Sequence, residues 1–190
     1  MTDDADTDPA ADTEADPEAE ADAVRLRPVR EDDLAMLERF LVDPEAAGPF
    51  SWFGWADPGR FRQRWIENGL LSEDGGQLMV TSGTARLGFV AWRKIVTSPA
   101  SHCWNTGIQL LPQAQGRGVG TRAQRLLVHY LFAHTPVARI EAVTERENIA
   151  EQRALEKAGF TREGVLRSLV FRDGHWRDAV SYSVLRDEAS

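Results

Sequence analysis

Cysteine, long apolar runs and clusters of basic residues are all scarce in this 190-residue chain. The single cysteine, Cys103, excludes an intrachain disulfide and a cysteine-based metal cluster, and low cysteine content is typical of a reducing compartment. No stretch approaches the roughly 20 apolar residues of a membrane-spanning helix, and the N-terminus is acidic where a signal peptide would be basic. We therefore expect a cytoplasmic protein with no membrane partner.

The sequence also lacks the histidine spacing of a metal site and the basic runs of a nucleic-acid-binding protein. The four histidines show no HxH, HxxxH or HExxH spacing, so we expect no metal site. Residues 1–23 hold ten acids and no base. The negative charge of this segment is therefore larger than the net charge of −8 of the whole chain. The remainder is nearly neutral and has no basic run, so nucleic acid is not an expected partner.

Composition divides the chain into two parts. Apart from its acids, residues 1–23 consist of Ala, Thr and Pro with one Met, a segment too polar to offset the entropy of ordering. We predict that this acidic tail is disordered. Residues 24–190 are long enough for one domain with a hydrophobic core.

Hydrophobic periodicity and turn residues predict an α+β domain. Strands are predicted at 24–28, 77–81, 86–95, 102–111, 138–144, 161–171 and 175–185. Helices are predicted at 30–41, 57–70, 116–133 and 148–158, with a loop over 42–57. The last two strands are joined through Asp173-Gly174, a strong hairpin signal.

A glycine-rich turn links a predicted strand to a predicted helix. Gly116, Gly118 and Gly120 leave room for a ligand to approach the backbone, and the helix that follows offers unpaired N–H groups at its first turn. A P-loop would need Gly-Lys-Ser/Thr, which is missing, and a Rossmann turn would come early in a repeated βαβ pattern. The turn therefore predicts an anion site for phosphate or pyrophosphate outside both nucleotide folds.

Two motifs resemble those of a known family. Gln115-x-x-Gly118-x-Gly120 is similar to the acyl-CoA pyrophosphate loop of the GNAT superfamily of N-acyltransferases. Residues 148–160, an Asn opening a helix that ends in Glu-Lys-x-Gly-Phe, are similar to its second signature. The likeness covers Val24 to about Asp187, and within the superfamily the chain resembles the Rim-type branch of ribosomal-protein N-terminal acetyltransferases and its small-molecule relatives.

The resemblance implies a GNAT fold and acetyl-CoA as donor. Its mixed sheet of about seven strands, flanked by about four helices, would splay between the strands at 102–111 and 138–144, and the pantetheine arm would lie in the gap. The N–H of Leu110 or Leu111 would polarise the thioester carbonyl as an oxyanion hole. The implied acetyl-CoA contacts are Leu110, Leu111, Gln115, Gly116, Arg117, Gly118, Val119, Gly120, Thr121 and Asn148. Asn148 is equally suited to a plain N-cap.

The acid and base are less clearly marked. Many members of the superfamily carry a Tyr where this chain has Leu155, so CoA would leave as a thiolate or another group would protonate it. Some Rim-type enzymes use a Ser and a Glu at the positions held here by Glu151 and Glu163. Glu163 is the expected base or else an exposed carboxylate, and Glu151 either takes part in catalysis or complements the helix dipole.

Aromatic residues concentrate in a loop between the first two predicted helices, where this fold places the acceptor entrance. We expect some of them to cover the sheet and others to contact an acceptor. The candidate acceptor residues are Phe50, Trp52, Phe53, Trp55, Trp104 and Asn105.

These features together predict an acetyl-CoA-dependent N-acetyltransferase. The acetyl group would pass directly, in a ternary complex, to the primary amine of a peptide or protein N-terminus or of a small molecule. Two alternatives stay open: transfer from succinyl-CoA or another acyl-CoA, and a non-catalytic acyl-CoA-binding module. The acceptor is not identified, and a homodimer is an open alternative to the monomer.

Overall fold

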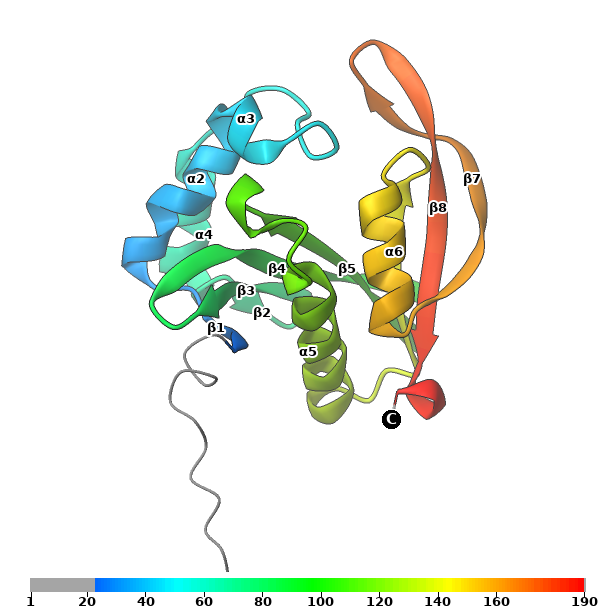
Figure 1. Cartoon of the computed structure of the whole chain (residues 1–190). Coiled ribbons are helices and arrows are strands. Elements are labelled where there is room, and N and C mark those ends of the chain that lie inside the picture. Colours follow the sequence, from blue (N-terminus) through cyan, green and yellow to red (C-terminus); the bar gives the residue numbers. More distant parts are fainter. Residues whose placement is uncertain (1–22, 190) are drawn as a thin grey trace, which may run out of the picture.

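A computed structural model describes residues 23–189 of the protein. They form one mixed sheet in the order β1-β3-β4-β5-β6-β8-β7, with β2 paired to the edge of β3 (Figure 1). The strands are β1 (Val24–Pro28), β2 (Leu71–Ser72), β3 (Gly75–Ser82), β4 (Ala85–Ser98), β5 (Ser101–Leu110), β6 (Arg139–Glu145), β7 (Thr161–Arg172) and β8 (His175–Leu185). All neighbouring pairs are antiparallel except β5 and β6.

Helices cover both faces of this sheet. The helices are α2 (Leu34–Val42), α3 (Pro44–Ala47), α4 (Gly59–Asn68), α5 (Val119–His134) and α6 (Ile149–Ala158), with short 3₁₀ turns η1 (Glu31–Asp33), η2 (Pro112–Ala114) and η3 (Arg186–Glu188). Figure 1 shows α5 and α6 side by side, with α2, α3 and α4 grouped apart from them. The loop after α3 and the β7–β8 hairpin rise at the same end of the molecule (Figure 1), where Arg172 of β7 approaches Phe50 of the loop.

Alternation along β3 shows how one strand serves two cores. Leu78 and Val80 point to the cluster that includes residues of α5 and α6, whereas Met79 between them packs with residues of α2 and α4. Successive side chains of a strand point to opposite faces, so a strand covered by helices on both sides is apolar throughout. The sheet is consequently buried at its centre.

The parallel pair β5 and β6 separates after three residue pairs. Trp104, Asn105 and Thr106 lie opposite Ile140, Glu141 and Ala142, and beyond this point the two strands diverge. Residues Gly107 to Leu110 of β5 stay paired with β4. The divergence therefore opens a gap in the middle of the sheet.

The α+β prediction is confirmed, with local differences that include the strand β2, which was not predicted and raises the seven predicted strands to eight. Residues 42–57 include α3, where the Asp43 side chain accepts hydrogen bonds from the N–H groups of Glu45 and Ala46. Helix α5 begins at Val119 because Gly116 and Gly118 have φ of 72° and 75°, in the left-handed region. The predicted helix at 30–41 is divided into η1 and α2. The disorder predicted for the acidic tail concerns residues that, apart from Ala23, lie outside the described part of the chain.

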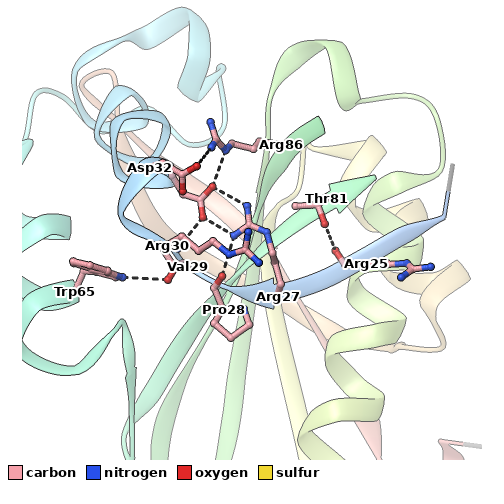
Figure 2. A network of polar contacts seen from close by, with 10 residues as sticks. Arg25, Arg27, Pro28, Val29, Arg30, Asp32, Trp65, Thr81 and Arg86 are labelled. Atoms are coloured by element: carbon pink, nitrogen blue, oxygen red, sulfur yellow. Dashed lines mark hydrogen bonds and ion pairs between the residues drawn. The ribbon is translucent and has the colours of Figure 1, made fainter. Parts of the chain in front are cut away.

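A buried carboxylate ties the first strand to the first helix. Asp33 is 0% exposed and accepts hydrogen bonds from Arg27 Nη1 at 2.6 Å, Arg27 Nη2 at 2.8 Å and the Arg30 backbone N–H at 2.8 Å. Arg86 Nε on β4 lies 2.8 Å from the same carboxylate and also contacts Asp32 (Figure 2). Desolvation alone would raise the pKa of Asp33, but the bonds from Arg27 and Arg30 lower it below its ordinary value.

The Asp33 network generates a stability prediction. Asp33→Asn should lower the free energy of unfolding by about 2 to 3 kcal/mol, less than a fully buried pair would lose, because Arg27 and Arg86 still reach solvent. Since the folded-state pKa is lowered, the carboxylate stabilises the fold above its unfolded pKa of about 4 and stops doing so as pH falls through the folded value. Urea unfolding at pH 7 and pH 3 should therefore show the loss shrinking in acid.

The matched control for Asp33→Asn is Asp32→Asn. Asp32 contacts the same Arg86, but its side chain is 66% exposed. We expect it to cost less than about 1 kcal/mol, as exposed ion pairs do. Equal losses for the two variants at pH 7 would contradict the assignment of the buried carboxylate as the anchor.

Candidate functional site

The gap between β5 and β6 opens into a cavity of about 260 Å³, here called the acidic cavity. Both diverging strands contribute to its walls, and α5, α6, the loop after α3 and β7 complete them. The lining residues are Phe50, Ser51, Phe53, Thr106, Gly107, Ile108, Gln124, Leu127, Ala142, Val143, Thr144, Glu145, Asn148, Glu151 and Val170. Its acidic residues are Glu145, which is ion-paired with Arg172, and Glu151, which is the carboxyl group left to meet a cation.

Backbone groups of β5 face this gap. Leu111 N–H donates to Leu87 O at 2.8 Å, and hydrogen-bonded and non-hydrogen-bonded pairs alternate along an antiparallel ladder. The N–H groups of Ile108 and Leu110 therefore point away from β4, towards the side where β6 has diverged. Of the two N–H groups predicted for the thioester, that of Leu111 is used inside the sheet, whereas that of Leu110 faces the gap.

The glycine-rich turn lies in a second cavity of about 390 Å³, here called the basic cavity. Gln115, Gly116, Gly118, Gly120 and Thr121 line it, together with Arg153 and Lys157 of α6. The first-turn N–H groups of α5 have no intrahelical partner and carry the positive end of its dipole. This cavity combines backbone donors with two cations and is suited to a polyanion.

Two predicted contacts of the turn are placed differently. Arg117 is exposed and does not line the basic cavity. The Val119 side chain is buried in the core, so only its backbone N–H can serve a ligand. Gln115 Nε2 donates to Leu110 O at 3.1 Å, which fixes the turn against the end of β5.

Asn148 and Glu151 stand where the two cavities meet. Both residues line both cavities. Asn148 Oδ1 accepts a hydrogen bond from the Glu151 N–H at 3.3 Å, so the N-cap role is present and leaves the Asn148 NH₂ group for a ligand. Burial raises the pKa of Glu151 to about 7, and the Gln124 side chain acts in the opposite direction. A carboxyl with this pKa exchanges protons readily near neutral pH.

Glu163 lies away from the cavities. Its carboxylate accepts hydrogen bonds from Arg139 Nη1 at 2.8 Å, Arg139 Nη2 at 2.5 Å and Ser183 Oγ at 2.9 Å. Arg139 begins β6, whereas the gap opens towards the other end of that strand. The bonds from Arg139 lower the pKa of Glu163 to about 2. The structure therefore does not place Glu163 on the acceptor side, and its carboxylate is a poor proton acceptor.

The position where relatives carry a tyrosine is part of the core. Leu155 is 1% exposed and packs among the residues under α5 and α6. The buried Tyr182 hydroxyl donates to Glu156 Oε1 at 3.1 Å and lines neither cavity. Neither residue is placed to protonate a leaving group in the gap.

The aromatic loop, residues 48–55, is divided between the cavities and the surface. Phe50 lines both cavities and Phe53 lines the acidic one. Trp52 lines an outer hollow formed with Pro44, Glu45, Gly48, Pro49, Arg172 and Asp173. Trp55 is 82% exposed and packs edge-on against Trp52, with ring centroids 6.0 Å apart. Phe50 is thus the inward-facing aromatic residue of the loop, and Trp55 is an outward-facing one.

Two predicted acceptor residues do not reach the cavity. Trp104 is buried and donates from Nε1 to Thr135 Oγ1 at 3.0 Å. Asn105 Oδ1 accepts from Arg93 Nε at 3.3 Å. Both precede the divergence of β5 from β6, where the sheet is still closed.

Sequence analysis did not single out four residues that line the site, three of which are charged. Glu145 ends β6 beside the gap, Gln124 lies beneath it on α5, and Arg153 and Lys157 flank the turn from α6. Arg153 and Lys157 are four residues apart on one helix, so the sequence could have indicated that they share a face. Nothing local marks Glu145, because its setting depends on strand divergence.

Residues 23–189 contain no group of three or more His, Cys, Asp or Glu arranged to hold a metal ion. Within the same range, no helix is long and apolar enough to span a bilayer.

Comparison with known proteins identifies the family. Residues 23–161 match the Acetyltransferase (GNAT) domain, which covers most of the chain, so the protein belongs to the GNAT acetyltransferase family. Members of this family take the acetyl group from acetyl-CoA. The gap between β5 and β6 beside the glycine-rich turn agrees with membership of this family.

Individual relatives share modest sequence identity with the chain or match only part of it. The chain is 40% identical over 73 residues to the probable N-acetyltransferase YjcK of Bacillus subtilis, a match covering 38% of this chain and 40% of that protein. It is 28% identical over 162 residues to the aminoglycoside N(6')-acetyltransferase type 1 of Klebsiella pneumoniae, covering 76% and 77%. The matches to YjcK, YnaD and YoaA span only 40%, 51% and 45% of those curated relatives.

Solved structures share the fold. Mycobacterium smegmatis RimJ in complex with CoA-disulfide superposes with a TM-score of 0.73 at 25% identity, covering 89% of this chain and 85% of that one. Spermidine N-acetyltransferase from Vibrio cholerae, in complex with CoA and spermine, gives a TM-score of 0.74 at 16% identity, covering 87% and 97%. The Rim-type resemblance predicted from sequence is thereby confirmed among the structural neighbours.

The basic cavity generates a binding prediction. Gly120→Glu should weaken CoA binding by at least about tenfold, because a carboxylate would enter the space that the helix N-terminus offers to an anion. Gly120→Ala is the matched control: a Cβ there would lie 3.7 Å from Leu110 Cδ1, an ordinary contact. Calorimetric titration with CoA should show near-normal affinity for the alanine variant. Equal affinity of the two variants would remove the turn from the CoA site.

Proposed function

We propose that the protein is an acetyl-CoA-dependent N-acetyltransferase that acetylates a primary amine. The observation that carries this proposal is the meeting, at the gap between β5 and β6, of a cavity lined by backbone donors and two cations with a cavity that holds the Glu151 carboxyl. The basic cavity fits the phosphates of a CoA donor, and the acidic cavity fits an ammonium group. Both cavities share Phe50, Ser51, Ile108, Asn148 and Glu151, so donor and acceptor would meet at these residues.

The residues of the basic cavity fit the donor. Backbone N–H groups from Gly118 to Thr121 would hold the pyrophosphate, with Arg153 and Lys157 adding positive charge. The free N–H groups of Ile108 and Leu110 would pair with the pantetheine arm and the thioester as an added strand pairs with a sheet edge. Bound acetyl-CoA supplies an activated acetyl carbonyl at this point.

Glu151 is the proposed base. An ammonium acceptor must lose a proton before its lone pair can attack, and Glu151 lies in the acidic cavity with a pKa of about 7. The Leu110 N–H would stabilise the negative charge that develops on the carbonyl oxygen. A thiol is a good leaving group, so the burial of Leu155 in the tyrosine position is compatible with departure of CoA as the thiolate.

The proposed base differs from the one that the family resemblance favoured. Glu163 is tied to Arg139 and has a pKa of about 2, so it would stay ionised and accept a proton only weakly. Glu151 was the second candidate, with a helix-dipole role as its alternative. Its burial beside the gap, rather than its position in a motif, supports the catalytic role.

The activity is tested by release of free thiol from acetyl-CoA in the presence of amines. The panel should contain alkylamines, aromatic amines, dipeptides with free N-termini, and polyamines, since relatives are named for spermidine and aminoglycoside acetylation. Succinyl-CoA run in parallel distinguishes a longer-acyl transferase. Tight CoA binding with no thiol release for any amine would favour the non-catalytic binding module.

The base assignment generates a kinetic prediction. Glu151→Gln should lower kcat by about a hundredfold at neutral pH, because the amide cannot accept the proton. In the unchanged protein kcat/KM should rise with pH through about 7 as Glu151 becomes ionised. In the variant the inflection near pH 7 should be lost. Its turnover should instead keep rising towards high pH, where more of the amine arrives already deprotonated, so its deficit should shrink there.

Glu163→Gln is the control for the same assay. Its removal of an exposed ion pair with Arg139 should leave kcat within about threefold of the unchanged protein. A large loss for Glu163→Gln together with normal turnover of Glu151→Gln would reverse the assignment.

A further inference from the structure

A buried ion pair forms part of the wall of the acidic cavity. Arg172 Nε donates to Glu145 Oε1 at 2.8 Å, and Arg172 Nη2 donates to Glu145 Oε2 at 2.7 Å. Glu145 is 5% exposed and Arg172 is 9% exposed. Glu145 lines the acidic cavity, whereas Arg172 lines the outer hollow on the other side of the pair. The guanidinium therefore stands between the cavity and the hollow.

Stability is a weak explanation for this pair. Two buried charges lose their hydration, and well-packed apolar residues of similar volume are often as stabilising or more so. The bidentate geometry also uses both oxygens of Glu145. What the pair does change is the charge of the cavity, because it compensates Glu145 and leaves Glu151 as the unpaired carboxylate.

Arg172 also connects this charge to the aromatic loop. Its guanidinium carbon lies 5.6 Å from the centroid of the Phe50 ring, a cation–π distance. Its Nη1 donates to Asp173 Oδ2 at 3.0 Å, so the nearest carboxylate of the outer hollow is occupied too. Glu45, also in the hollow, is exposed, and solvent screens it.

These contacts define which acceptors the cavity would take. A diamine or polyamine whose reacting nitrogen lies near Glu151 would seek a second carboxylate for its other ammonium group. Glu145 is suitably buried for that purpose, but a guanidinium of the same chain already holds it. An acceptor with an uncharged body would instead pack against Phe50 and Phe53 without displacing anything.

We propose that Arg172 is a specificity-determining residue that blocks Glu145 as an anchor for a second ammonium group, so that the protein selects monoamines with an apolar or planar body over polyamines. This inference rests on the proposed function, because it concerns the acceptor side of the same site. It separates this chain from the relatives that are named for spermidine acetylation.

The experiment compares butylamine with 1,4-diaminobutane, which have the same carbon chain. Binding of each amine to the CoA-loaded protein is measured by calorimetry, and kcat/KM is measured with acetyl-CoA. The unchanged protein should bind the diamine no more than about twofold better, the statistical advantage of two equivalent ends. In Arg172→Met the preference for the diamine should rise by at least about tenfold, because Glu145 becomes free to pair with the second ammonium.

Two further variants make the test decisive. Glu145→Gln combined with Arg172→Met should return the ratio to that of the unchanged protein, because the second carboxylate is then gone. If Arg172→Met does not fold, Arg172→Lys provides the measurement: its single ammonium cannot hold both oxygens of Glu145, so the ratio should rise part of the way. A merely structural role would change both amines alike and leave the ratio unmoved.

An unchanged ratio in a folded Arg172 variant would overturn the proposal, and so would a tenfold diamine preference in the unchanged protein. Failure of the proposed function is seen separately. It would show as no thiol release with either amine, whereas the calorimetric ratio reports on the Glu145 anchor without any turnover.

Discussion

The separation of β5 from β6 is the constraint on which the rest of the site depends. Parallel strands normally keep their ladder to the end, but here the pairing stops at Thr106 and Ala142. β5 stays paired with β4 on its other side as far as Leu110. The backbone groups of Ile108 and Leu110 are consequently presented to a gap instead of to a neighbouring strand, and a ligand can replace the missing strand.

Everything charged in the site is arranged around that gap. The N-terminus of α5 and the cations of α6 lie on the side of the glycine-rich turn, while Glu145 and Glu151 lie deeper, on the side of β6 and the start of α6. This separation lets one cleft hold a polyanion at one end and a cation at the other. Burial dominates the pKa of Glu151, and the Gln124 side chain acts against it.

The contrast between the carboxylates of Glu151 and Glu163 comes from their surroundings. Glu151 follows the helix-opening Asn148 by three residues and Glu163 follows it by 15, and the sequence offers no means to rank the two by environment. In the fold, Glu163 meets Arg139 and two serines of β8, whereas Glu151 meets apolar residues and Gln124. The same functional group thus becomes a fixed anion in one place and a titrating group in the other.

Local sequence determined the order of elements, the glycine-rich turn, the helix caps and the hairpin at Asp173-Gly174, because these depend on backbone conformation and near neighbours. It also determined the family, since both motifs are continuous segments. Tertiary structure alone decided that Trp104 belongs to the core and that the Leu111 N–H is hydrogen-bonded within the sheet. It also decided that Arg172 pairs with Glu145, which lies 27 positions away in the chain. Such contacts depend on how strands and helices far apart in sequence pack together, and no local pattern encodes them.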